Sequence, residues 1–180
     1  MGGKMTEEIK LHLGCGKRKL PGWVGVDSQA DVGADVVADV RYLDHWASGE
    51  VAAIYACHVM EHIPRPDVLP TLREWRRVLQ PGGKLYVAVP DFSKLAFLYA
   101  KLGTPLWRLI GPLCGRQDYP ANTHYSVYDY QYLAWLLTEA GFHTIKQRGA
   151  FDWQPEGHDD YSRAEIDNLE ISLNVEAIRG

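Results

Sequence analysis

The segment Cys57–Pro64, which reads CHVMEHIP, gathers three side chains that could bind a metal ion or move a proton. His58, Glu61 and His62 have the spacing H-x-x-E-H, which holds zinc in one class of proteases when it lies within a helix. Pro64 follows closely and disfavours a helical conformation at the residue before it, so that only one turn is available. The spacing therefore argues against a zinc protease. We assign no metal ligand, and the residues alone leave open whether a metal ion is used. A buried histidine satisfied by the backbone is an alternative role for His62.

Small, acidic and imidazole side chains recur where the first four predicted strands end, namely Gly14, Gly16, Asp27, Asp39 and His58. Glycine lets the backbone approach a ligand without a Cβ in the way, and a carboxylate accepts hydrogen bonds from a ribose or an adenine amino group. Each residue alone would suit a turn or a helix cap. In an open parallel sheet, however, ligands bind beyond the carboxyl ends of the strands. We therefore expect these side chains to line one crevice.

The elements that position these residues follow from hydrophobic periodicity, which indicates an α/β fold with a mainly parallel sheet. Pro70 falls in the first turn of one predicted helix, while Ser126 and Asp129 form a capping pair for another that stops at Gly141. We predict strands at 9–13, 23–27, 35–40, 53–59, 84–90, 143–148 and 169–178. We predict helices at 67–79 and from about 129 to 140, with two short helices within 92–114.

The motifs LHLGCGKR, VGVD, ADV, ACHVMEHI and LQPGGKLYVAVP resemble those of the class I S-adenosylmethionine-dependent methyltransferases. The resemblance runs from about Ile9 to Asp91, roughly half of the chain. It implies a Rossmann-like, mainly parallel seven-stranded sheet in three α/β/α layers, with S-adenosyl-L-methionine as cofactor. It also implies cofactor-binding residues: Leu13, Gly14, Cys15 and Gly16 around the methionine part, Asp27 on the ribose hydroxyls, Asp39 and Val40 at adenine, and His58 beside the sulfonium.

Two departures from this family pattern concern the cofactor loop and the first two connections. Lys17 and Arg18 stand where the family often has its third glycine, and either could contact the methionine carboxylate instead. The connections 14–22 and 28–34 are shorter than the dozen residues that a parallel crossover normally needs. We therefore expect helices reduced to single turns or lost after the first two strands. One face of the sheet, which carries His12, would then be partly open or covered by a partner chain.

The acceptor side is predicted at 92–126, a lid inserted into a single domain that spans 1–180. The segments GRQDYPANTHYS and ISLNVEA resemble small methyltransferases associated with bacterial surface-polysaccharide synthesis. This resemblance implies O-methylation of a sugar or another small hydroxylated acceptor. A histidine suits the general base that a hydroxyl needs, so we predict His124 in that role, with Asp118 and His62 as alternatives. A second polar run at 155–163 would be solvated, as loop charges usually are.

Composition excludes several classes of function. The formal charge of −4 argues against a non-specific nucleic-acid binder, and no apolar run approaches the length of a transmembrane helix. Three widely spaced cysteines and an N-terminus without a secretory signal predict a cytoplasmic protein with reduced thiols. Six tryptophans and ten tyrosines favour a homodimer.

Two alternative functions remain open from the residues alone. A non-catalytic S-adenosylmethionine-binding module would keep the glycine turn and Asp27 but show no turnover. An NAD-dependent oxidoreductase would use the same two features, yet the chain offers no G-x-G-x-x-G after its first strand.

Overall fold

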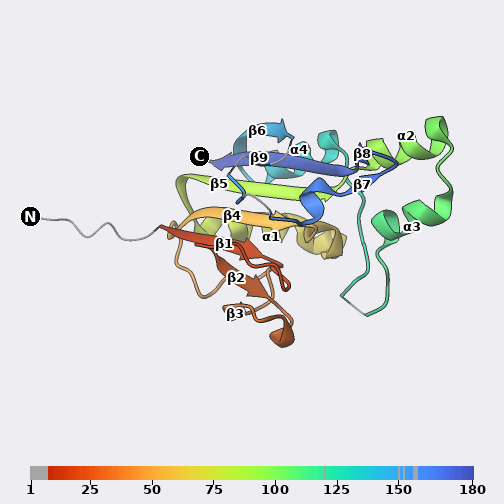
Figure 1. The fold of residues 1–180 in the computed structure, drawn as a ribbon. Helices are drawn as coiled ribbons and strands as arrows, with labels where there is room; N and C mark the ends of the chain where they lie inside the picture. Colours follow the sequence, from red (N-terminus) through yellow and green to blue (C-terminus); the bar gives the residue numbers. More distant parts are fainter. Residues whose placement is uncertain (1–7, 120, 150, 152, 156–157) are drawn as a thin grey trace, which may run out of the picture.

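The computed structural model describes residues 8–119, 121–149, 151, 153–155 and 158–180. Seven strands form one sheet in the order β3-β2-β1-β4-β5-β9-β6, and two short strands form a separate hairpin (Figure 1). The first five strands of this order are parallel, while β9 runs antiparallel to both β5 and β6. The strands are β1 (Ile9–Leu13), β2 (Val24–Asp27), β3 (Val36–Val37), β4 (Val51–Cys57), β5 (Leu79–Pro90), β6 (Phe142–Arg148), β7 (Glu165–Ile166), β8 (Leu169–Glu170) and β9 (Ser172–Arg179).

The helices cover one face and the carboxyl-end edge of this sheet. Figure 1 shows α1 and α4 behind the sheet, and α2 and α3 beyond the carboxyl ends of the parallel strands. None of the described helices combines the length and hydropathy needed to span a membrane. The helices are α1 (Arg65–Val78), α2 (Phe92–Leu102), α3 (Leu106–Cys114) and α4 (Tyr130–Glu139), with 3₁₀ turns η1 (Ala30–Val32), η2 (Met60–His62) and η3 (Tyr161–Arg163).

The helix-covered face carries the main hydrophobic core. Strand residues such as Leu11, Val87 and Val175 alternate toward this face and pack with Trp75 of α1 and Leu137 of α4, all fully or almost fully buried. Burial of this much apolar surface, at roughly 25 cal/mol per Å², is the main force that holds α1 and α4 on the sheet. The core therefore fixes the strand register on which the site at the strand ends depends.

The opposite face is polar and aromatic, and the described part of the chain covers it with coil and the short turn η3. His12 pairs across β1 and β4 with Tyr55, and both side chains are buried. Phe151 and Trp153 pack against this layer, with Phe151 5.7 Å from Tyr55 between ring centroids. Asn174 donates hydrogen bonds to backbone carbonyls at 2.9 and 3.0 Å. The third layer is thus a coil that crosses the sheet.

This coil bears on two expectations from the sequence. The first connection runs as turns and extended chain, and the second contains only the short turn η1, as the short spacings predicted. The face above them is covered at His12 by the chain's own coil. Its far end is open, since Lys84 is exposed and Lys10 is half-buried, so that the face is partly open as predicted.

Several local boundaries differ from those predicted. Pro70 lies inside α1, in its second turn, because the helix begins at Arg65 and Pro66 takes the early position that suits proline. Asp129 is itself the cap of α4, since its carboxylate accepts from the Tyr132 amide, and Ser126 lies outside the helix. Element type is set by periodicity, whereas these ends depend on individual caps.

Strand boundaries differ for similar reasons. β5 begins at Leu79 and includes the Pro-Gly-Gly turn, where its register with β4 shifts. The last predicted strand is divided into β8, which pairs with β7 in the hairpin, and β9 of the main sheet. Ile171 lies between them and packs with Leu95 and Leu109 of the α2–α3 pair. The third strand contains only Val36 and Val37.

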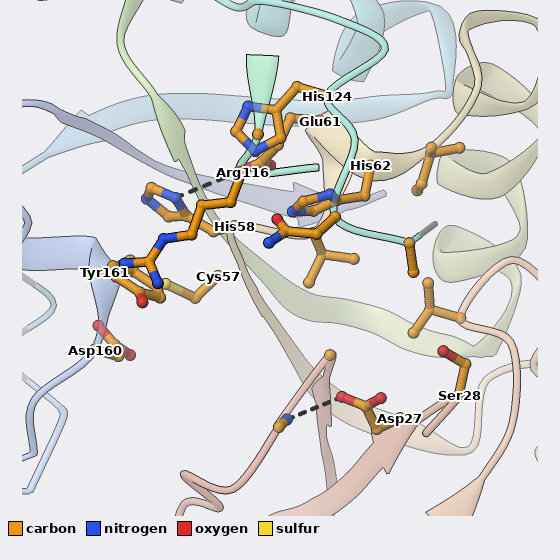
Figure 2. Close-up of a pocket in the computed structure, with 18 of the residues that line it drawn as sticks. Asp27, Ser28, Cys57, His58, Glu61, His62, Arg116, His124, Asp160 and Tyr161 are labelled. Atoms are coloured by element: carbon orange, nitrogen blue, oxygen red, sulfur yellow. Dashed lines mark hydrogen bonds and ion pairs between the residues drawn. The ribbon is translucent and has the colours of Figure 1, made fainter. Parts of the chain in front are cut away.

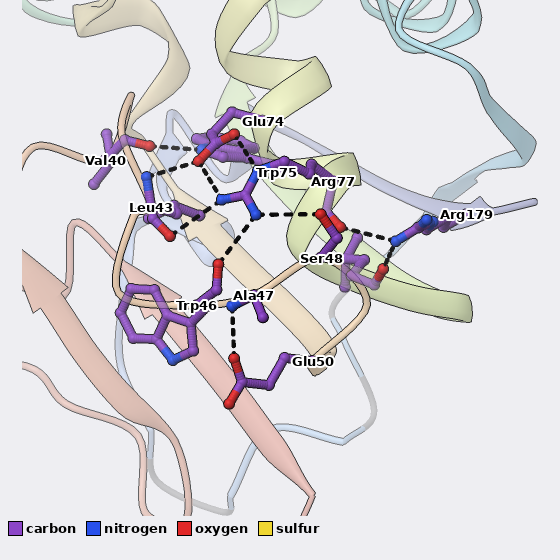
Figure 3. Close-up of polar contacts among 11 residues, drawn as sticks. Val40, Leu43, Trp46, Ala47, Ser48, Glu50, Glu74, Trp75, Arg77 and Arg179 are labelled. Atoms are coloured by element: carbon purple, nitrogen blue, oxygen red, sulfur yellow. Dashed lines mark hydrogen bonds and ion pairs between the residues drawn. The ribbon is translucent and has the colours of Figure 1, made fainter.

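The long connection between β3 and β4 is held to α1 by polar contacts (Figure 3). Glu74 accepts from the Leu43 amide at 3.0 Å and from Arg77 at 2.7 Å. Arg77 also donates to the Trp46 carbonyl at 3.1 Å, and Trp75 donates its indole N–H to the Val40 carbonyl at 2.8 Å. These bonds satisfy backbone N–H and C=O groups of the loop, and they fix the loop segment next to the cleft.

Candidate active site

A cleft of about 930 Å³ lies at the carboxyl ends of the parallel strands. The order of strands reverses there, between β1 and β4, which is where open parallel sheets bind ligands. Its volume lies within the range of about 300–1,000 Å³ for small-molecule sites. Every site residue predicted from the sequence lines this cleft except Leu13, whose side chain is fully buried in the helix-covered core.

The glycine turn after β1 and Asp27 at the end of β2 form one wall. Gly14 has φ of +62°, and a Cβ there would lie 2.4 Å from a methyl carbon of Val59, so that no larger residue fits. Gly16, in contrast, faces open space. The Asp27 carboxylate accepts from the amides of Gly16 and Gln29, each at 2.9 Å. Each oxygen keeps a second lone pair, which a ribose hydroxyl could use.

Asp39 and Val40 form the next part of the wall, although Asp39 lies two residues beyond β3 instead of at its end. Arg41 binds the Asp39 carboxylate at 2.7 Å and Asp67 at 2.7 Å. Burial would raise the pKa of Asp39, but the hydrogen bonds from Arg41 outweigh it and lower that pKa. Asp39 is therefore a charged hydrogen-bond acceptor, and Arg41 already uses some of its lone pairs.

The basic residues after the glycine turn lie at the mouth of the cleft, and both are exposed. The guanidinium of Arg18 lies 5.4 Å from the ring centroid of Tyr161, a cation–π contact, while Lys17 lines the same mouth. Tyr161 belongs to η3 and lies 5.4 Å from the His58 ring. It closes the side of the cleft opposite Asp27 (Figure 2).

We predicted the run at 155–163 to be solvated, and its residues 156 and 157 lie outside the described part of the chain. Its described residues are instead partly buried and contribute Asp160 and Tyr161 to the cleft. Asp160 accepts from the Tyr55 hydroxyl at 2.5 Å and from the Ser162 amide at 2.9 Å. Burial would raise the pKa of Asp160, but these hydrogen bonds dominate and lower it. Sequence reasoning missed this wall. The only signal was the density of polar residues, which does not distinguish a solvated loop from a docked one.

His58 follows β4 directly and is held in an unusual conformation. Its φ is +52°, a left-handed backbone that few non-glycine residues adopt. The ring lies 2.9 Å from the Ser172 hydroxyl through Nε2, and Nδ1 lies 3.3 Å from a carboxylate oxygen of Glu61. Burial, together with nearby His124, lowers the pKa of His58 to about 3. The ring is therefore neutral near pH 7.

Glu61, His62 and His124 form the floor of the cleft, as Figure 2 shows. Glu61 is fully buried, and burial raises its pKa to about 8. The His62 and His124 rings meet edge to face with centroids 4.7 Å apart. Burial lowers the pKa of both rings, to about 4 for His124, where His62 adds to the effect.

Asp118, the other residue predicted as a base, lines the cleft but is exposed, and it accepts from the Asn122 side chain at 2.6 Å. The exposed Arg116 also lines the cleft and reaches over its opening in Figure 2. The predicted bases thus divide into two kinds. His62 and His124 are neutral and partly buried on the floor, whereas Asp118 is a solvated rim residue.

Comparison with known proteins identifies related sequences and folds. A family model described as "Methyltransferase domain" matches residues 11–147. The sequence matches no curated protein. A methyltransferase structure from Methanosarcina mazei is similar over 97% of this chain and 94% of its own, with TM-score 0.64 and 15% identity. One from Archaeoglobus fulgidus is similar over 95% and 86%, with TM-score 0.61 and 17% identity.

A third similar structure contains a ligand of interest. Phosphoethanolamine N-methyltransferase 2 from Haemonchus contortus, in complex with S-adenosylhomocysteine, has TM-score 0.54 and 16% identity, over 81% of this chain and 36% of its own. At such identities the three structures establish a shared fold, and the family match carries the functional information.

Proposed function

The chain belongs to the methyltransferase domain family, and we propose that, as an S-adenosylmethionine-dependent methyltransferase, it methylates a hydroxyl group of a sugar or another small hydroxylated acceptor. The observation that carries the proposal is the pair of neutral imidazoles, His62 and His124, on the cleft floor. Neutral imidazole can accept the proton that a hydroxyl loses, whereas an imidazolium could not.

The cofactor side of the cleft fits S-adenosylmethionine by its donors, acceptors and free space. Gly14 and Gly16 leave room beside the backbone, and Asp27 retains lone pairs for a ribose diol. We assign Asp39 and Val40 to adenine and Lys17 to the methionine carboxylate, with Cys15 and His58 beside the methionine part. When bound, the cofactor supplies a methyl group on a positively charged sulfur that is already activated for departure.

The acceptor side supports a polar, hydroxylated ligand. The rim is lined by Asn122, Tyr125 and Asp118, which offer both hydrogen-bond donors and hydrogen-bond acceptors. Helix α3 contributes Gly111 and Pro112 to the wall. The segment at 92–126 is thus suited to hold the acceptor over His124 and to exclude water from it. The resemblance of this rim to methyltransferases of surface-polysaccharide synthesis makes a sugar the first acceptor to test.

The test is methyl transfer from labelled S-adenosylmethionine to a panel of sugars and nucleotide-sugars, with mass spectrometry of the product. We expect an O-methyl sugar. His124→Asn should lower kcat by about 100-fold or more, the range that general bases contribute, with unchanged affinity for S-adenosylhomocysteine. His45→Gln, at an exposed position before β4, is the matched control and should keep full activity. Methylation of nitrogen or carbon, or wild-type turnover by His124→Asn, would contradict the proposal.

A further inference from the structure

Four hydrogen-bond acceptors converge at the floor of the cleft, beside the predicted cofactor loop. Glu61 and His62 belong to η2, His58 precedes that turn, and His124 comes from the segment that follows α3. One ligand atom from each of Glu61, His62 and His124 lies within 4.8 Å of the others. Figure 2 shows these side chains pointing toward one another. The hydrogen-bond partners around them fix which atoms face the centre.

The tautomers of His62 and His124 follow from their partners. Nδ1 of His62 lies 3.2 Å from the carbonyl oxygen of Thr123, and Nδ1 of His124 lies 3.0 Å from that of Pro112. A carbonyl can only accept a hydrogen bond, so each Nδ1 must carry the proton. A neutral ring has only one, so each Nε2 holds a free lone pair. Metal-binding histidines are commonly oriented in this way, by donating their other N–H to a backbone carbonyl.

The tautomer of His58 follows from similar reasoning. The Ser172 hydroxyl donates its only hydrogen to the Tyr161 carbonyl, so its oxygen must accept from Nε2 of His58. Nδ1 of the neutral ring is then a lone pair, and it lies 3.3 Å from a Glu61 oxygen, outside hydrogen-bond geometry. Two acceptors at this distance repel each other unless a proton or a cation lies between them.

The carboxyl group of Glu61 is the strongest feature in favour of a cation at this place. Its side chain is fully buried, and neither carboxylate oxygen has a hydrogen-bond donor among the described residues. A buried carboxylate without a partner costs roughly several kcal/mol, so the group either takes up a proton, in line with the raised pKa of Glu61, or coordinates a metal ion that displaces this proton. Arg116 reaches over the opening, but no ion pair joins it to Glu61 among the described contacts.

We propose that Glu61, His62 and His124 bind a divalent transition-metal ion, with His58 as the nearest further donor. Neutral imidazole and carboxylate ligands suit Zn²⁺ and similar ions better than Mg²⁺ or Ca²⁺, which prefer oxygen alone. Bonds of about 2.0–2.2 Å would require the donors to move together by roughly 1 Å.

This site differs from the protease arrangement that the H-x-x-E-H spacing suggests. η2 supplies Glu61 and His62 from a single 3₁₀ turn, and the third ligand is His124, 62 positions after His62 in the chain. His58, the first residue of the motif, bonds instead to Ser172 through Nε2. A ligand so distant in sequence explains why the spacing alone predicted no metal.

The proposed ion would also change the role of the imidazoles, a consequence that rests on the proposed function. A cation in contact with the acceptor oxygen stabilises the alkoxide, so that the hydroxyl proton leaves to water more readily. His62 and His124 would then act as ligands in place of free bases. Metal binding itself does not depend on this role and is measured without an acceptor.

The experiment is titration of chelator-treated protein with Zn²⁺ by calorimetry and with Co²⁺ by absorption spectroscopy. We expect one ion per chain and a Co²⁺ spectrum of nitrogen and oxygen ligands, without the ultraviolet band of a thiolate. Glu61→Gln and His124→Gln should each weaken Zn²⁺ binding by about 100-fold or more. His45→Gln, exposed and outside the cluster, should bind as the wild type does.

Circular dichroism would check that each variant is folded. If a variant does not fold, Co²⁺ binding by the wild type still tests the site. Absence of Zn²⁺ and Co²⁺ binding by the folded wild type would overturn the proposal, as would unchanged affinity in both folded variants. A thiolate band would assign the ion to cysteine and would also overturn it. Methyl transfer that persists in metal-free protein would leave the proposed function standing and remove only the ion's role in it.

Discussion

Substitution of Asp27 by asparagine isolates one polar contact that organises the cofactor loop. Its two oxygens accept from the Gly16 and Gln29 amides, each at 2.9 Å, and the side chain is 7% exposed. Asparagine has the same shape, but its NH₂ group must face one of these two N–H donors. The variant therefore loses a charge-assisted hydrogen bond, worth about 1.5–3 kcal/mol, and sets two donors against each other.

We expect Asp27→Asn to weaken binding of S-adenosylhomocysteine by about 10- to 100-fold, since each 1.4 kcal/mol is a factor of about ten. Isothermal titration calorimetry measures this directly. Asp31→Asn is the matched control, because Asp31 is an exposed residue in the neighbouring turn and should bind as the wild type does. Affinity of Asp27→Asn equal to that of the control would refute the view that Asp27 holds the cofactor loop.

Two further predictions concern stability. Burial lowers the pKa of His12 to about 4, so between about pH 6.5 and pH 4 the unfolded state binds more protons than the folded state, and the free energy of unfolding decreases as the pH is lowered. On going from about pH 7.5 to pH 5, the wild type should lose about 2 kcal/mol more of this free energy than His12→Gln does, as measured by urea unfolding. Equal losses in the two proteins would contradict this prediction. Gly14→Ala should destabilise the protein by about 1–3 kcal/mol more than Gly82→Ala, because both glycines have positive φ but only Gly14 would meet Val59; equal unfolding midpoints would show that no overlap occurs.

The sheet and the cofactor wall could be predicted from the sequence because their signals are local. The strand at Ile9–Leu13 has the predicted bounds, and the alternation around Val175 places one side of β9 in the core. Glycine at a strand end and a carboxylate at the next one carry their chemistry in the residue type. Parallel strands then bring these ends together wherever the sheet order reverses.

The remaining parts depend on contacts between distant segments. The sequence could not place Phe151 and Trp153 on the polar face of the sheet. A coil has no hydrophobic periodicity, so its sequence does not indicate which face of the sheet it covers. The burial of Asp160 depends on Tyr55, 105 positions away. The meeting of His124 with Glu61 likewise requires the path of α3 to be known.

The coil that covers the polar face has a consequence for how this protein could change its acceptor. In many α/β enzymes a loop at the cleft can vary freely while the core stays intact. Here Asp160 and Tyr161 are adjacent, and the first is bonded into the sheet layer through Tyr55 while the second forms the cleft wall. A change in one alters the fit of the other. Engineering of specificity should therefore begin at the rim, around Asn122 and Tyr125, where side chains can be exchanged without disturbing the sheet.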